Sequence, residues 1–178
     1  MKSITYTSEN QLSRYIFKIP LLALLVISLL LTGCLSKKNS QSNKSGYDLY
    51  LLVGQSNMVG VGKIEAEDTL EHPRVFVLNE TDEFVLAKDP LPFKRKAKGV
   101  GPGLTFGKIM ADANPKAKIG LIPGAVGGTK ISYWTPDNPR GLYQEAIRKA
   151  KVAMQQGKLK GIIWQQGESD SNMKDAPL

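Results

Sequence analysis

Short apolar runs that alternate with helical patterns constrain the fold of this chain more than any other feature. The runs cover residues 47–53, 74–78, 118–123 and 159–165, and turn-forming residues bound each of them. Helical spacing of apolar side chains is found over Pro102–Ala113 and over residues 142–156. Because continuous apolar strands are buried on both faces, this alternation predicts an α/β fold with a parallel sheet between layers of helices.

Polar and glycine-rich segments follow three of the four predicted strands. The first strand leads into residues 54–57, the third into 124–129 and the last into 165–170. These segments supply a serine hydroxyl, bare glycine amides, and a glutamine beside carboxylates. In parallel sheets, sites form at the carboxyl ends of strands. A nucleophile, oxyanion donors and an acid are the parts of an acyl-transfer site, so we expect an enzyme.

The amino-terminal segment has the pattern of an export signal. Basic residues precede an apolar run over 21–31, which is too short to span a bilayer but suits the core of a secretory signal. The following residues, 31–34, resemble a bacterial lipobox. We therefore predict a lipoprotein signal peptide over 1–33, acylation of Cys34, a flexible tether over 34–46 and an exported cell-envelope protein that is anchored to the membrane. A plain signal peptide or N-terminal anchor with an incidental cysteine is the alternative.

Composition and charge limit the classes of partner that this chain is expected to bind. Charged residues are 22% and hydrophobic residues 42% of the chain, so a folded domain is expected rather than disorder. The formal net charge is +8, and part of it comes from the basic cluster at 94–98. A solvated loop is the favoured interpretation of this cluster; contact with anionic glycans or a membrane surface is the alternative. No nucleic-acid motif, metal-ligand spacing or cofactor fingerprint is present, and the single cysteine excludes an intrachain disulfide.

Four segments together resemble the SGNH (GDSL-like) hydrolases, in the branch of sialate O-acetylesterases and acetylxylan esterases, carbohydrate esterase family 6. They cover residues 52–58, 99–106, 122–131 and 164–170, in the order of the family. The resemblance implies a three-layer α/β/α, flavodoxin-like fold with a central parallel sheet. It also implies a serine esterase that removes O-acetyl groups from an acetylated glycan and needs no metal or organic cofactor. Sialic acid, xylan or another glycan could carry the acetyl group.

The same resemblance implies roles for individual residues. Ser56 is the expected nucleophile, and the oxyanion hole combines the amides of Ser56 and Gly127 with the side chain of Gln166. Gly128 competes with Gly127 for this role. Glu168 is expected either to pair with the catalytic histidine or to be a buried carboxylate that holds its loop. Trp134, which follows the second loop, is expected either to pack on a sugar ring or to anchor that loop.

The general base is the one part of the family's catalytic pattern that this sequence does not show. The family places it in an Asp-x-x-His motif near the C-terminus, whereas this chain has one histidine, His72, before the second strand. That position belongs to the amino end of the sheet, about 17–20 Å, or a strand length, from Ser56. We therefore expect residues 47–178 to be the N-terminal part of an esterase domain, incomplete at its C-terminus. A non-catalytic carbohydrate-binding surface lipoprotein and an inactive remnant are the alternatives.

Overall fold

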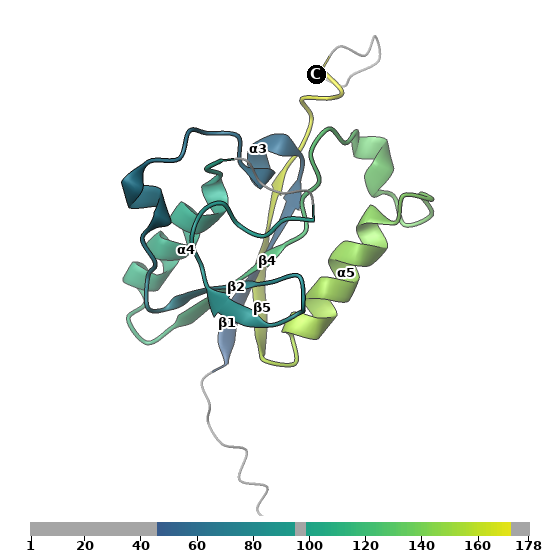
Figure 1. Cartoon of the computed structure of the whole chain (residues 1–178). Coiled ribbons are helices and arrows are strands. Elements are labelled where there is room, and N and C mark those ends of the chain that lie inside the picture. The colour runs from purple at the N-terminus through teal and green to yellow at the C-terminus, as the bar shows by residue number, and fades with distance from the viewer. Residues whose placement is uncertain (1–45, 95–98, 172–178) are drawn as a thin grey trace, which may run out of the picture. The chain divides into compact units, whose positions relative to one another are not determined.

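A five-stranded sheet forms the centre of the domain in the computed structural model, which describes residues 46–94 and 99–171 (Figure 1). Its strands are β1 (Tyr47–Gly54), β2 (Val75–Leu78), β3 (Phe84–Leu86), β4 (Lys118–Pro123) and β5 (Gly157–Gln165). The strand order is β3-β2-β4-β1-β5, and β1 is parallel to both of its neighbours. Because β1 lies between β4 and β5, its carboxyl end lies between theirs.

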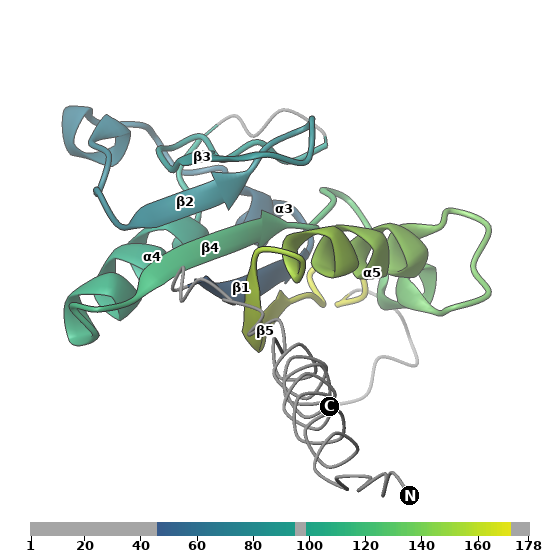
Figure 2. The same ribbon diagram turned by 90° about the horizontal axis from the view of Figure 1, so that it is seen from below.

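Helices cover both faces of the sheet, and this confirms the predicted three-layer α/β fold. Helix α4 (Pro102–Ala113) packs on one face and α5 (Leu142–Ala153) on the other (Figures 1 and 2). The α4 side buries Leu52, Leu104 and Leu121, and the α5 side buries Leu49, Ile122 and Ala150. The short helices are α3 (Ser56–Val59), η3 (Ala66–Thr69) and η4 (Ile131–Trp134).

Helix α4 lies close to the sheet because two of its buried positions are glycines. A Cβ at Gly103 would lie 2.6 Å from Leu52 Cδ1, and one at Gly107 would lie 2.8 Å from Val75 Cγ1. Proline at the first helical position favours the start of α4. The observed bounds of α4 are those predicted from the sequence.

The sheet departs from the prediction at β3, which is antiparallel to β2. The two strands are joined by residues 79–83 only. A connection of this length closes a hairpin, whereas a parallel neighbour requires a crossover of a dozen or more residues. The predicted central parallel sheet is confirmed in β2, β4, β1 and β5, and the antiparallel edge strand β3 was not predicted.

Strand β5 and helix α5 also differ in detail from the predicted pattern. In β5, Ile162 is 59% and Trp164 45% exposed, whereas β1 is buried on both faces over most of its length. An edge strand has a neighbour on one side only, so its apolar run is half covered. Helix α5 ends at Ala153 instead of residue 156, and two apolar residues of the predicted helical range, Tyr143 and Met154, are exposed.

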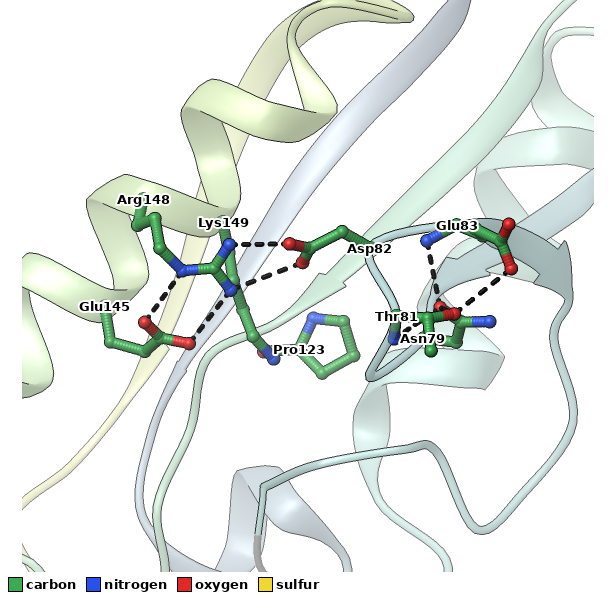
Figure 3. A network of polar contacts seen from close by, with 8 residues as sticks. All are labelled: Asn79, Thr81, Asp82, Glu83, Pro123, Glu145, Arg148 and Lys149. Carbon is green, nitrogen blue, oxygen red and sulfur yellow. Dashed lines mark hydrogen bonds and ion pairs between the residues drawn. The ribbon is translucent and has the colours of Figure 1, made fainter.

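A polar network ties α5 to the β2–β3 hairpin (Figure 3). The Asn79 Oδ1 atom accepts hydrogen bonds from the backbone N–H groups of Thr81 and Glu83, each at 2.9 Å, and this organises the turn. The turn presents Asp82 to Arg148, at 2.7 Å, and Arg148 also contacts Glu145 at 2.9 Å. These hydrogen bonds lower the pKa values of Asp82 and Glu145.

In the part of the chain that the structure describes, no helix is both long and apolar enough to cross a membrane. Several predicted features lie outside the described residues. They are the signal peptide over 1–33, Cys34, the tether up to residue 45 and residues 95–98 of the basic cluster.

Candidate active site

The turn after β1 presents Ser56 at the start of a helix. Gly54 has φ +127°, and a Cβ there would lie 1.8 Å from the carbonyl oxygen of Gln165, so the turn requires glycine. The backbone N–H of Gln55 donates to the same carbonyl at 3.0 Å. Helix α3 begins at Ser56 and is anchored by buried Met58. A strand, a sharp turn and a helix with serine at the turn form an arrangement that exposes a nucleophile.

The loop after β4 continues beside the end of β1. Its Val126 N–H donates to the carbonyl of Gly54 at 3.0 Å. A Cβ at Gly127 would lie 3.8 Å from the Cβ of Ser56, whereas one at Gly128 would meet no atom within 4 Å. Of the two glycines left open by the sequence, the structure thus brings Gly127 next to Ser56.

The loop after β5 holds the residues on both sides of Ser56. The carboxylate of Glu168 accepts hydrogen bonds from the side-chain amides of Gln55 and Asn57. The Ser169 hydroxyl donates to Gln55 Oε1 at 2.6 Å, and Gln55 is only 1% exposed. The ends of β1 and β5 are therefore joined by side chains as well as by the sheet.

Glu168 holds its loop, but it is exposed rather than buried as that alternative assumed. Hydrogen bonds from its own backbone N–H, and then from Gln55 and Asn57, lower the pKa of Glu168. The group is therefore an ionised acceptor at neutral pH. Its pairing with a catalytic histidine stays a prediction.

Gln166 joins the second and third loops. Its Nε2 donates to the carbonyl of Thr129 at 2.6 Å, and its buried Oε1 has no hydrogen-bond partner among the described residues. Asp170 supports the same junction by accepting from the N–H of Ile131 at 2.9 Å. An amide nitrogen carries two hydrogens, so Gln166 keeps one donor beyond this bond. Its role in an oxyanion hole stays a prediction.

Trp134 anchors the second loop. It is buried, its Nε1 donates to the Thr129 hydroxyl at 3.3 Å, and its ring meets Trp164 edge to face at 5.3 Å. The Thr129 hydroxyl in turn donates to the carbonyl of Val126 at 2.8 Å. These contacts favour the anchoring role of Trp134 over a platform for a sugar ring.

His72 lies away from this site. It precedes β2, and its Nε2 is 3.2 Å from Asp112 Oδ1, near the C-terminal end of α4. The strands β2, β4 and β1 run parallel, so His72 is at the amino end of the sheet and Ser56 at the carboxyl end. The only histidine of the sequence is not placed to activate Ser56.

Sequence reasoning missed Lys149, which supports the end of β4. Its Nζ donates to the carbonyl of Pro123 at 2.8 Å (Figure 3), and the residue is 6% exposed. Burial lowers the pKa of Lys149. Pro123 immediately precedes the loop that carries Gly127, so this bond fixes the base of the loop. Lys149 falls on the apolar stripe of α5 between Ala146 and Ala150, which is the one signal that could have identified it.

No group of three or more histidine, cysteine, aspartate or glutamate residues is placed to hold a metal ion in the described ranges. The chemical groups brought together at the carboxyl ends of β1, β4 and β5 are a serine, glycine amides and a glutamine. A serine beside glycine amides on a sheet covered on both faces is the arrangement expected of a hydrolase of the SGNH type.

The family comparison agrees with the fold. The chain belongs to the carbohydrate esterases described as sialic acid-specific acetylesterases, whose family model matches residues 46–177. The resemblance inferred from the four sequence segments is thereby confirmed.

Individual relatives support the same family. A probable carbohydrate esterase of Arabidopsis thaliana is 29% identical over 154 residues, which are 75% of this chain and 58% of the relative. The X-ray structure of an Arabidopsis thaliana protein superposes with a TM-score of 0.64 at 28% identity, covering 70% of this chain and 59% of that one. The crystal structure of NanS has a TM-score of 0.60 at 19% identity, covers 74% and 57%, and shows a shared fold. The chain thus spans less than two thirds of the length of each.

Proposed function

We propose that this chain contributes the serine and oxyanion part of an active site that removes acetyl groups from carbohydrate esters. One observation carries the proposal. The loops after β4 and β5 are joined beside the Ser56 turn, and a Cβ added at Gly127 would lie 3.8 Å from the Cβ of Ser56. Membership of a carbohydrate esterase family supports the reaction class.

In the proposed reaction, the Ser56 hydroxyl attacks the acetyl carbonyl carbon and forms a tetrahedral intermediate. The amides of Ser56 and Gly127 and the second N–H of Gln166 donate hydrogen bonds to its oxyanion. Each such donor is worth about 10²–10³ in rate. Collapse releases the sugar hydroxyl and leaves an acetyl-serine, which water hydrolyses.

The proposal assigns the proton transfers to a histidine beyond this set of residues. His72 is paired with Asp112 at the other end of the sheet, and a base must lie within hydrogen-bond reach of the serine. Without that base, serine is a weak nucleophile at neutral pH. The 178-residue chain by itself is therefore expected to turn over slowly.

The esterase proposal is tested with para-nitrophenyl acetate. The 178-residue chain is compared with a chain extended by a related C-terminal segment that bears Asp-x-x-His, each with a Ser56→Ala variant. We expect Ser56-dependent hydrolysis in the extended chain only. Rapid turnover by the short chain that is abolished by His72→Ala would contradict the assignment of the base.

We further propose that Cys34 carries a lipid that anchors the protein to the cell envelope, on the basis of the lipobox-like residues 31–34. Metabolic labelling with a fatty-acid analogue should mark the wild-type chain and leave Cys34→Ala unmarked. Equal labelling of both chains would refute the anchor.

A further inference from the structure

Strand β5 presents an uncharged edge. It is the last strand in the order β3-β2-β4-β1-β5, so no described strand pairs with its outer edge (Figure 2). Beyond a register shift opposite Leu49 and Tyr50, residues 161–165 pair regularly with residues 50–54 of β1. This stretch of β5 reads Gly-Ile-Ile-Trp-Gln and contains neither a charged residue nor a proline. Edge strands of natural proteins usually carry such residues, because they prevent pairing with another chain.

Apolar side chains project from both faces of this stretch. Ile162 pairs in register with Leu51 and lies on the α5 face, where Trp164 meets Trp134. Ile163 lies on the α4 face and packs against the core of that side. Ile162 and Trp164 stay exposed, since α5 covers β1 and β4 more than the edge strand. An uncharged edge with exposed apolar side chains is the kind of surface that another strand covers.

The stretch is self-complementary about its middle residue, Ile163. A twofold axis through Ile163 sets two copies of β5 antiparallel, with Ile162 of each copy opposite Trp164 of the other. Residues that pair across strands point to the same face, so these four side chains would meet on the α5 face. Pairs of an aromatic and a β-branched residue across strands are favourable. The arrangement would therefore cover both exposed side chains of each copy.

The charges that flank the stretch match the same arrangement. Two lysines, Lys158 and Lys160, precede it, and Asp48 contacts Lys160 at 3.4 Å. Two carboxylates, Glu168 and Asp170, follow it. Antiparallel pairing about Ile163 brings Lys158 of one copy to the level of Glu168 of the other, so opposite charges meet. Parallel pairing would instead set like charges side by side, which is unfavourable.

We propose that the outer edge of β5 binds β5 of a second copy of this chain, antiparallel about Ile163, and joins the two sheets into one. Lys158 of the second copy then lies beside Glu168, whose carboxylate holds Gln55 and Asn57 on either side of Ser56. The second copy thus adds a cation at the border of the candidate site. This inference goes beyond the proposed function, because it requires no esterase chemistry.

Cysteine cross-linking of the full chain tests the register of pairing. Cys34→Ser removes the only native thiol, and detergent micelles are kept in large excess over protein. A residue on the twofold axis faces its own copy at about 4.5–5.5 Å between Cα atoms, which is within disulfide range. Ile163→Cys should therefore form a disulfide-linked dimer under mild oxidation. Lys116→Cys, at an exposed position before β4, is the control and should stay a monomer.

A charge substitution tests the apolar contact. Ile162→Lys would place a cation in the proposed interface, and Ile162 is 59% exposed, so the domain should still fold. Ile109→Lys on α4 is the matched control, because Ile109 is 61% exposed and lies outside β5. Sedimentation velocity over a range of protein concentrations measures the Kd of the dimer. Lost burial of an isoleucine predicts that Ile162→Lys raises this Kd at least about tenfold and that Ile109→Lys leaves it unchanged.

Four outcomes would overturn the inference. They are a monomer at every concentration, equal cross-linking of Ile163→Cys and Lys116→Cys, an equal Kd in Ile162→Lys and Ile109→Lys, and a monomer that covers the edge with another partner. Tryptophan fluorescence of a monomer that responds to phosphatidylglycerol vesicles would assign the edge to a membrane. A response to the separate C-terminal segment of the extended chain would assign it to that segment. The esterase assay is independent of all four, so loss of Ser56-dependent hydrolysis would overturn the proposed function alone.

Discussion

Replacing Gln55 by methionine should loosen the turn that presents Ser56. The side chain is 1% exposed, donates to the Glu168 carboxylate and accepts from the Ser169 hydroxyl at 2.6 Å. A hydrogen bond to a charged group contributes about 1.5–3 kcal/mol and a neutral one about 0.5–1.5 kcal/mol. Methionine has a similar volume and makes neither bond, so we expect the free energy of unfolding to fall by about 2–4 kcal/mol.

Urea denaturation followed by tryptophan fluorescence measures this loss, since Trp134 and Trp164 lie beside the loops concerned. Gln144→Met is the matched control at an exposed glutamine and should change stability by less than about 0.5 kcal/mol. The Gln55→Met variant should also raise the pKa of Glu168, because a hydrogen bond to the ionised form of Glu168 is lost. A loss below about 0.5 kcal/mol for Gln55→Met, or an unchanged pKa of Glu168, would refute the reasoning.

Three further predictions concern stability and the oxyanion loop. Burial, and then the charge of Asp68, raises the pKa of Asp89 from 3.8 to about 6. The folded state therefore binds more protons than the unfolded state across that window, and stability should fall as pH rises through it. Asp89→Asn should abolish the slope and stabilise the fold at neutral pH by up to about 3 kcal/mol, measured by urea denaturation; an unchanged slope would contradict this. Burial lowers the pKa of Lys149 below its ordinary value of 10.5. The folded state therefore releases this proton at a lower pH than the unfolded state, and the free energy of unfolding should rise as the pH approaches 10.5. Urea denaturation of Lys149→Met should show no such rise. Gly127→Ala should change the free energy of unfolding by less than about 1 kcal/mol, because its methyl group would lie 3.8 Å from Ser56 Cβ, an ordinary contact. The same variant should lower the esterase rate of the extended chain. Gly128→Ala, at φ +70°, should lower the free energy of unfolding by about 1–2 kcal/mol and affect the rate less.

The sequence predicts those elements whose signal is local. Buried strands β1 and β4 are continuous apolar runs, and α4 is bounded by Pro102 at its start and Asn114 at its end. Strand β3 has three residues, all at least partly exposed, and forms through pairing with β2. Its apolar run, Phe84–Leu86, is shorter than the four to eight residues that identify a strand, so the sequence analysis did not predict it.

The residues of the candidate site could be predicted from the sequence, but the contacts among them could not. The three strand ends follow from the sequence, whereas their meeting depends on the order β4-β1-β5, which no local pattern encodes. The bond between Gln55 and Glu168 joins residues 113 positions apart, and nothing in either segment indicates it. Gly127 and Gly128 are equivalent as residue types, and only the backbone path decides which one faces Ser56.

The central claim is that Ser56 is the nucleophile of an acetylesterase site whose oxyanion hole includes Gly127. It is tested most directly by a crystal structure of the extended chain after reaction with a methylphosphonate ester, whose tetrahedral phosphorus imitates the acetyl transition state. The account predicts a phosphorus–oxygen bond to the Ser56 Oγ atom and a phosphoryl oxygen within about 2.7–3.1 Å of the Gly127 amide nitrogen. Phosphorus attached to another residue, or a phosphoryl oxygen turned away from Gly127, would contradict it.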